Sequence, residues 1–186
     1  MLASHADERG VACRPLLRRL TELVRAARAP REPSLYPTKA DGTEPSRLGW
    51  CYGDLGIASA LWQAGSRLGD PAVLDEAREL LAHTLAYRDA DNGKIADASL
   101  CHGSMGVSHM FRRAALATGD RAWLAGADRW LDHTLSLAAR PHGLAFHLLD
   151  RDIACDDLLQ GTAGVGLALI ASLGIEPAWD RCLLLS

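Results

Sequence analysis

The chain has no long apolar segment and no excess of basic charge. None of its apolar runs approaches the roughly 20 residues that a membrane-spanning helix needs. Its formal net charge is −3, and no cluster of Lys and Arg alternates with aromatic residues, which argues against nucleic-acid binding. The first ten residues are polar and charged, unlike a signal peptide. We therefore expect a cytoplasmic protein with no membrane span.

Cysteine is scarce and odd in number, with five in 186 residues. An odd count argues against a disulfide framework, and thiols stay reduced in the cytoplasm. Cys13 and Cys182 lie in unrelated contexts, and we expect them to be small core residues. The length and the 48% apolar content predict a single globular domain over residues 1–186.

Two of the cysteines lie in related motifs fifty residues apart. Cys51 belongs to a Trp-Cys-Tyr-Gly sequence at 50–53, and Cys101 is followed by His102 and a glycine. Two thiolates and an imidazole suit Zn²⁺, and they leave one tetrahedral position for water or substrate, as in catalytic zinc sites. The sequence therefore predicts Cys51, Cys101 and His102 as ligands of Zn²⁺. The alternative is that the cysteines are buried structural thiols.

The same offset of fifty relates a longer stretch of chain. Residues 51–85 and 101–135 match without a gap at the cysteine, at both glycines of a Gly-x-x-Gly step and at several later positions. A third, shorter copy begins near residue 159, where Leu159 takes the place of the cysteine. Self-similarity at a fixed period indicates stacked supersecondary units. We therefore expect repeats that start near 51, 101 and 159.

Each repeat has the pattern of two helices. The first is mostly small and apolar, and a Gly-Asp pair at 69–70 or 119–120 stops it and caps the next. The second is amphipathic. Apolar inner helices and half-polar outer helices predict an all-α fold in a curved or closed α/α array. A Pro-rich loop over 29–49 and a short extended arm near 144–149 complete the expected structure.

The proposed ligand set favours one kind of chemistry. Zn²⁺ with two thiolates and a neutral imidazole is formally neutral, and a thiol that binds to it loses its proton. Such an electron-rich centre leaves the bound thiolate nucleophilic, whereas a centre with more imidazoles favours activated water. The ligands therefore favour sulfur transfer or addition over hydrolysis.

At these residues the sequence resembles the LanC lanthipeptide cyclases and the wider LanC-like group. The segments 50–53 and 101–103 resemble the two zinc motifs of the family, 158–169 resembles its late Leu-rich repeat, and 177–185 resembles its closing segment. The resemblance implies an α/α toroid with zinc at its centre, here a partial ring from the C-terminal half. It also implies a lanthionine synthetase C-type cyclase that joins a cysteine thiol of a precursor peptide to dehydroalanine or dehydrobutyrine in lantibiotic biosynthesis.

The resemblance also assigns residues around the predicted metal. Arg47 falls at the active-site arginine of the family, where a guanidinium would stabilise the enolate that develops after thiolate attack. The alternative for Arg47 is a solvated loop arginine. Trp50 and Tyr52 match aromatics that shape the substrate pocket.

One departure from the family pattern leaves other functions open. The family's upstream Asp and its upstream His, usually in a His-Gly-x-x-Gly motif, have no counterpart in this sequence. Possible partners besides the dehydrated precursor peptide are therefore a dehydratase or a missing N-terminal half. Two alternative functions remain: a LanC-like glutathione- or thiol-binding protein, and a truncated, non-catalytic peptide-binding module.

Overall fold

The fold is known from a computed structural model, which describes residues 13–30, 32–39, 42–140, 143–144, 146–148, 151–175, 178–183 and 185. These residues are predominantly helical. The elements in chain order are α2 (Cys13–Ala26), α3 (Asp54–Leu68), α4 (Pro71–Tyr87), α5 (Ser104–Thr118), α6 (Ala122–Ala138), β1 (Phe146–Leu148), β2 (Arg151–Ile153), α7 (Thr162–Ser172) and the 3₁₀ helix η1 (Ala178–Leu183).

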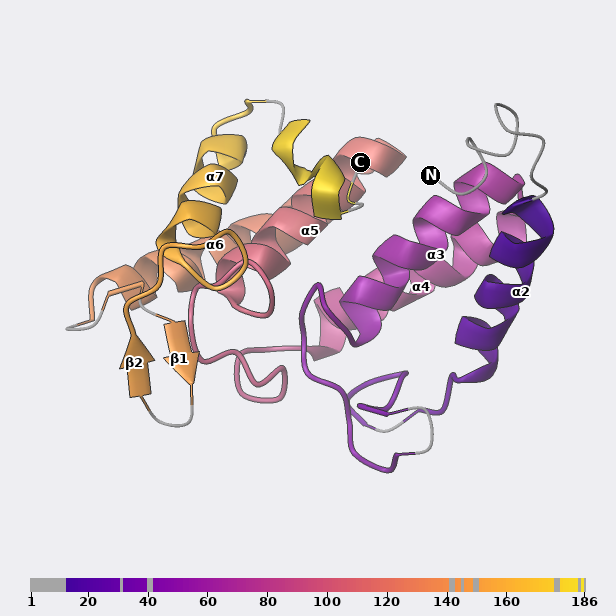
Figure 1. The fold of residues 1–186 in the computed structure, drawn as a ribbon, viewed down its shortest axis with the longest axis horizontal. Helices are drawn as coiled ribbons and strands as arrows, with labels where there is room; N and C mark the ends of the chain where they lie inside the picture. The colour runs from indigo at the N-terminus through magenta and orange to yellow at the C-terminus, as the bar shows by residue number, and fades with distance from the viewer. Residues whose placement is uncertain are drawn as a thin grey trace.

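The helices pack as successive hairpins. Helix α3 packs against α4, and α5 packs against α6, while contacts of α3 with α5 and of α5 with α7 join one hairpin to the next. Helix α2 packs on α3 at one end of the row, and α7 lies at the other (Figure 1). This arrangement is part of an α/α toroid and confirms the predicted fold class.

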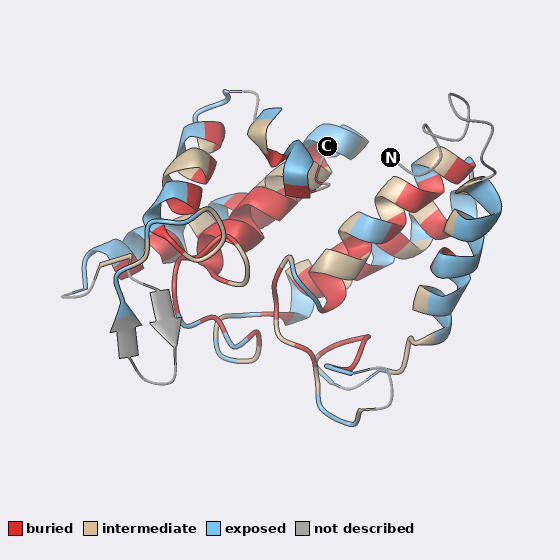
Figure 2. Cartoon of the chain, in the orientation of Figure 1, coloured by how far each residue is buried: buried red, intermediate tan, exposed pale blue. Residues whose placement is uncertain are grey.

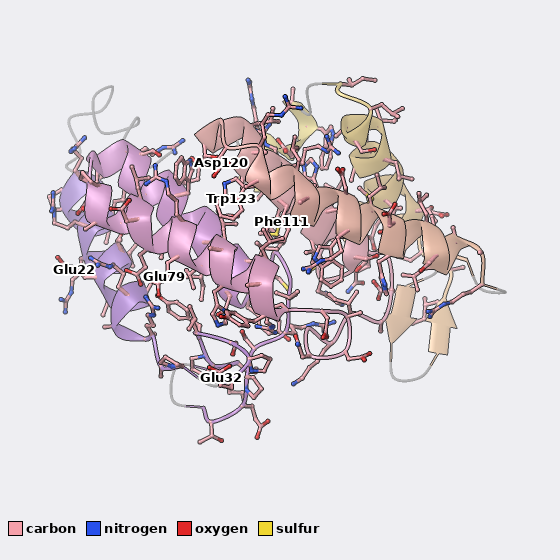
Figure 3. All side chains as sticks on the ribbon, turned by 180° about the vertical axis from the view of Figure 1, so that it is seen from behind. Glu22, Glu32, Glu79, Phe111, Asp120 and Trp123 are labelled. Atoms are coloured by element: carbon pink, nitrogen blue, oxygen red, sulfur yellow. The ribbon has the colours of Figure 1, made fainter. Side chains whose placement is uncertain are left out.

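The helix ends form where the Gly-Asp pairs predict them. Gly69 and Gly119 end α3 and α5 in the left-handed conformation, with φ of 64° and 71°. The side chain of Asp70 then accepts hydrogen bonds from the first amides of α4, as an N-cap residue does. Asp120 is placed similarly at the start of α6, where its carboxylate accepts from Ala122 N at 2.9 Å (Figure 3).

Helix α5 is buried along much of its length (Figure 2). Along α5, residues 104–111 are all buried, because this helix is covered by α3, α6 and α7. Phe111 and Trp123 fill the space between the two main hairpins, and both are buried (Figure 3). Gly126 permits this packing, because a Cβ there would lie 2.9 Å from the Phe111 ring and 3.1 Å from Leu85.

The extended arm expected near 144–149 includes the strand at 146–148, which pairs antiparallel with β2 so that Phe146 lies opposite Ile153. Residues 145, 149 and 150 lie outside the described part of the chain. The two strands pair because strand backbone groups require hydrogen-bond partners.

The prediction that Cys13 and Cys182 are core residues was wrong for Cys182, which is exposed, whereas Cys13 is half-buried.

Among the helices of the described residues, none is both long enough and apolar enough to cross a membrane.

Candidate metal centre

Close backbone contacts hold the loops that precede the three inner helices. The second glycine of each Gly-x-x-Gly step lies against the carbonyl group of the residue six positions earlier. A Cβ would lie at a clashing distance from that oxygen in every repeat: 2.5 Å for Gly56 and Trp50, 2.0 Å for Gly106 and Leu100, and 1.8 Å for Gly164 and Leu158. The repeated glycines thus let each loop fold back tightly onto the first turn of its helix.

Backbone hydrogen bonds then join the three loops to one another. The amide of Trp50 donates to Cys101 O at 2.7 Å, and the amide of Cys101 donates to Leu159 O at 2.8 Å. Gly49 allows the first contact, because a Cβ there would lie 2.9 Å from the Cβ of His102. Equivalent positions of the three repeats therefore meet at one end of the inner helices. The third repeat brings Leu159, which has no metal-ligating atom.

These contacts bring the three predicted ligands together. The ligand atoms of Cys51, Cys101 and His102 all lie within 4.8 Å of one another. Cys51 is exposed, whereas Cys101 and His102 are partly buried. Two ligands of a tetrahedral zinc ion lie about 3.8 Å apart when each is about 2.3 Å from the metal. The donor types therefore fit Zn²⁺, and the three ligand atoms would have to move only slightly closer together to bind one ion. Within the described ranges, no other group of three or more His, Cys, Asp and Glu side chains lies close enough together to hold a metal ion.

The two thiols influence each other's protonation. A hydrogen bond with Cys101 and a further one with His102 lower the pKa of Cys51 to about 4, although burial opposes this change. The hydrogen bond with Cys51, together with burial and the negative charge of that thiolate, raises the pKa of Cys101. The metal-free pair therefore holds one proton at neutral pH, and a metal ion that binds both sulfurs must displace it.

Arg47 lies within electrostatic reach of the Cys101 thiol. Its positive charge lowers the pKa of Cys101, against the larger raising effect of Cys51. The guanidinium donates from Nη2 to Lys94 O at 3.1 Å, and its buried Nε has no hydrogen-bond partner among the described residues. Arg47 thus has a donor group left over beside the cluster.

The two predicted pocket aromatics differ in their surroundings. Trp50 is partly buried, and its Nε1 donates to Leu183 O at 2.9 Å, so the C-terminal helix η1 holds the indole in place. Tyr52 is 41% exposed. Both flank Cys51 in the chain, but only Trp50 has a fixed partner among the hydrogen bonds of the described residues.

Sequence reasoning missed a buried ion pair next to this site. Asp54 and Arg88 have fully buried side chains, and Arg88 Nη1 lies 3.3 Å from Asp54 Oδ2. Asp54 stands inside the first Gly-x-x-Gly step, and a carboxylate that opens a mostly apolar helix was a signal that could have revealed it. Arg88 follows α4 and has no comparable signal in the sequence.

A second buried polar group was also missed. His109 Nε2 lies 2.8 Å from Asp180 Oδ2, and Arg113 Nε lies 3.2 Å from the same oxygen. The His109 ring stacks on Trp179 with a centroid separation of 5.0 Å. These contacts fasten η1 to α5, and η1 in turn holds Trp50.

A family model described as lanthionine synthetase C-like protein matches residues 6–184, a span that includes all three members of the cluster. No curated protein matches the chain.

Proposed function

Because the chain belongs to the lanthionine synthetase C-like family, we propose that it is a zinc-dependent lanthionine cyclase of the cytoplasm. Its substrate would be a dehydrated precursor peptide, in which it joins a cysteine thiol to dehydroalanine or dehydrobutyrine. The observation that carries this proposal is the grouping of Cys51, Cys101 and His102 at one end of the inner helices. Three ligands leave a fourth position for the peptide thiol.

The three cluster residues would hold the metal. When bound, Zn²⁺ supplies the charge that removes the proton of an incoming thiol while leaving the sulfur nucleophilic. The protein's part is to present two thiolates and one neutral imidazole together. Cys51 already has a lowered pKa, and Cys101 must give up the proton that the pair shares.

The role of Arg47 follows from the charge that develops on the peptide. Thiolate sulfur bonds to the β-carbon of the dehydro residue, and the electron pair of the carbon–carbon double bond moves toward the carbonyl oxygen as an enolate. The guanidinium of Arg47 would stabilise that oxygen through its unused donors, since among the described residues its side chain donates from Nη2 to Lys94 O alone. Protonation of the α-carbon completes the ring, and the peptide's mass does not change.

The aromatics that flank Cys51 would contact the peptide. Trp50 presents a side chain whose orientation is set by Leu183, whereas Tyr52 is exposed and free to adapt. A fixed indole beside the cluster would limit the approach of the peptide thiol to one direction.

The exposure of Cys51 supports one alternative. A cluster that opens to solvent at this thiol would also accept a free thiol such as glutathione, so the chain would then bind or add glutathione. A second alternative is a non-catalytic peptide-binding module that acts with a dehydratase.

Mass spectrometry with a dehydrated peptide separates these functions. The zinc-loaded chain should form a ring, so the peptide keeps its mass and loses one thiol that iodoacetamide can alkylate. Addition of glutathione would raise the mass instead. A chain that binds zinc and peptide but changes neither mass nor thiol count would support the non-catalytic module, and a chain that binds no zinc would contradict the cyclase. Cys155→Ala, outside the cluster, is the matched control.

A further inference from the structure

The buried carboxylate of Asp54 connects the metal-binding loop to a distant loop segment. Asp54 Oδ1 accepts from Tyr36 N at 2.9 Å, and Oδ2 accepts from Leu35 N at 3.0 Å. Both donors are backbone amides of the Pro-rich loop, and Asp54 itself has no exposed surface. A carboxylate that is buried in this way must be hydrogen-bonded and paired, or its charge is very costly.

Arg88 supplies the opposite charge and reaches two more segments. Its Nη1 faces Asp54, its Nη2 donates to Ser46 O at 2.5 Å, and its Nε donates to the Asn92 side chain at 3.1 Å. Burial lowers the pKa of this guanidinium, and the charge of Asp54 opposes that change. Buried ion pairs contribute little net stability compared with apolar residues of the same shape, so stability alone does not account for this one.

The segments that the pair joins are those on both sides of Arg47. Ser46, which accepts from Arg88, directly precedes Arg47, and Leu48 directly follows it; both are fully buried. Leu48 N donates to Gly93 O at 2.9 Å, and Arg47 donates to Lys94 O, so both bonds end in the turn that follows Arg88. The backbone of Arg47 is thus held from both sides by structure built around the ion pair.

We propose that Asp54 and Arg88 are positioning residues that set the location of Arg47 beside the cysteine–histidine cluster. This inference rests on the proposed cyclase function and adds to it the origin of the arginine's placement. Neither residue of the pair touches the peptide. Each acts through the loop segments 34–36 and 46–48, whose backbone groups bond to the pair or to the turn that follows Arg88.

A double-mutant cycle tests this role. Asp54→Asn keeps the shape of the side chain but removes its charge, and we expect it to lower kcat for ring formation by about tenfold with little change in KM. In an Arg47→Gln background the same change should lower kcat by less than about twofold, because the group that it positions is gone. An equal loss of kcat in both backgrounds, or no loss in the wild-type background, overturns the proposal.

Two further variants separate positioning from damage to the fold. Arg88→Lys keeps a positive charge opposite Asp54 but lacks the fork that also reaches Ser46 O, so kcat should fall as in Asp54→Asn. Ser108→Ala removes a buried hydrogen bond between α5 and α6, and we expect it to lower stability without a change in kcat. If Ser108→Ala lowers kcat as much as Asp54→Asn does at equal loss of stability, the positioning role fails.

Hydrogen exchange provides a readout that does not need cyclase activity. In Asp54→Asn and Arg88→Lys the amides of Tyr36 and Leu48 should exchange faster, while those of α5 and α6 keep their protection. If the wild-type chain binds zinc but forms no ring, the cyclase proposal fails and exchange alone decides the role of the pair. Unchanged exchange of the Tyr36 and Leu48 amides in Asp54→Asn overturns the positioning role.

Discussion

The indole Nε1 of Trp50 donates a 2.9 Å hydrogen bond to the carbonyl oxygen of Leu183, 133 residues later in the chain. The first residue of the Trp-Cys-Tyr-Gly motif is thereby tied to η1, which His109 and Arg113 of α5 hold through Asp180. The loop that carries Cys51 is therefore held by the C-terminal segment on one side and by the Asp54–Arg88 pair on the other.

Trp50→Phe should loosen η1 without removing the aromatic ring from the site. The change leaves Leu183 O without its donor, and we expect the free energy of unfolding to fall by about 1–2 kcal/mol. The amides of η1 should exchange faster. Trp130→Phe is the control, because Trp130 lies on α6 beside Arg129 and His133. Equal η1 exchange in the two variants would contradict the prediction.

Substitution of two glycines of α7 by alanine should change the stability of the fold in opposite directions. A Cβ at Gly164 would lie 1.8 Å from Leu158 O, whereas a Cβ at Gly166 meets nothing within 4 Å. Gly164→Ala should therefore force the loop off the helix and destabilise the fold by about 3 kcal/mol or more. Gly166→Ala should stabilise it by about 0.5–1 kcal/mol, because glycine is a poor helix former. Denaturant unfolding measures both, and a similar loss in the two variants would contradict the close approach.

Zinc content should depend on all three members of the cluster. Cys51→Ala, Cys101→Ala and His102→Ala each remove one donor, so we expect each to lower zinc affinity by at least tenfold, a loss of about 1.4 kcal/mol in binding free energy. Cys182→Ala changes an exposed thiol outside the cluster and should bind zinc as the wild type does. In the cobalt-substituted protein, thiolate-to-cobalt absorption should weaken in the two cysteine variants and persist in Cys182→Ala.

The metal-free protein should be alkylated first at Cys51. Its pKa is lowered to about 4, so its thiolate is present at all pH values above that. Its alkylation rate should stay nearly constant from about pH 5 to 8, whereas an ordinary thiol reacts about tenfold faster per pH unit. Cys101, with a raised pKa, should react later. A Cys51 rate that rises with pH like that of a free thiol would contradict the paired state.

The lowered pKa of Cys51 also makes the stability of the metal-free protein depend on pH. Because the pKa of Cys51 is lower in the folded than in the unfolded chain, this thiol stabilises the metal-free protein increasingly as pH rises from about 4 toward the pKa of a free thiol. The contribution is lost on acidification through pH 4. Thermal unfolding of the metal-free wild type and Cys51→Ala should show curves that converge at the acid end.

The helical architecture and the proximity of Cys51, Cys101 and His102 could be predicted from the sequence, because both follow from local patterns. The fifty-residue offset, the Gly-Asp stops and the apolar inner helices are short-range patterns, and the structure has helices where they place them. The two cysteines hold equivalent repeat positions, so stacking the repeats was enough to bring Cys51 near Cys101.

Only the tertiary structure revealed what holds the trio in place. Asp54 bonds to amides near residue 35, Arg88 bonds to a carbonyl at 46, and Trp50 bonds to a carbonyl at 183. In each case one partner is a backbone group, which every residue carries and no sequence pattern distinguishes. Sequence alone therefore determined the repeats and the grouping of Cys51, Cys101 and His102, whereas the positions of Arg47 and Trp50 depend on which distant backbone groups the fold brings within hydrogen-bonding distance.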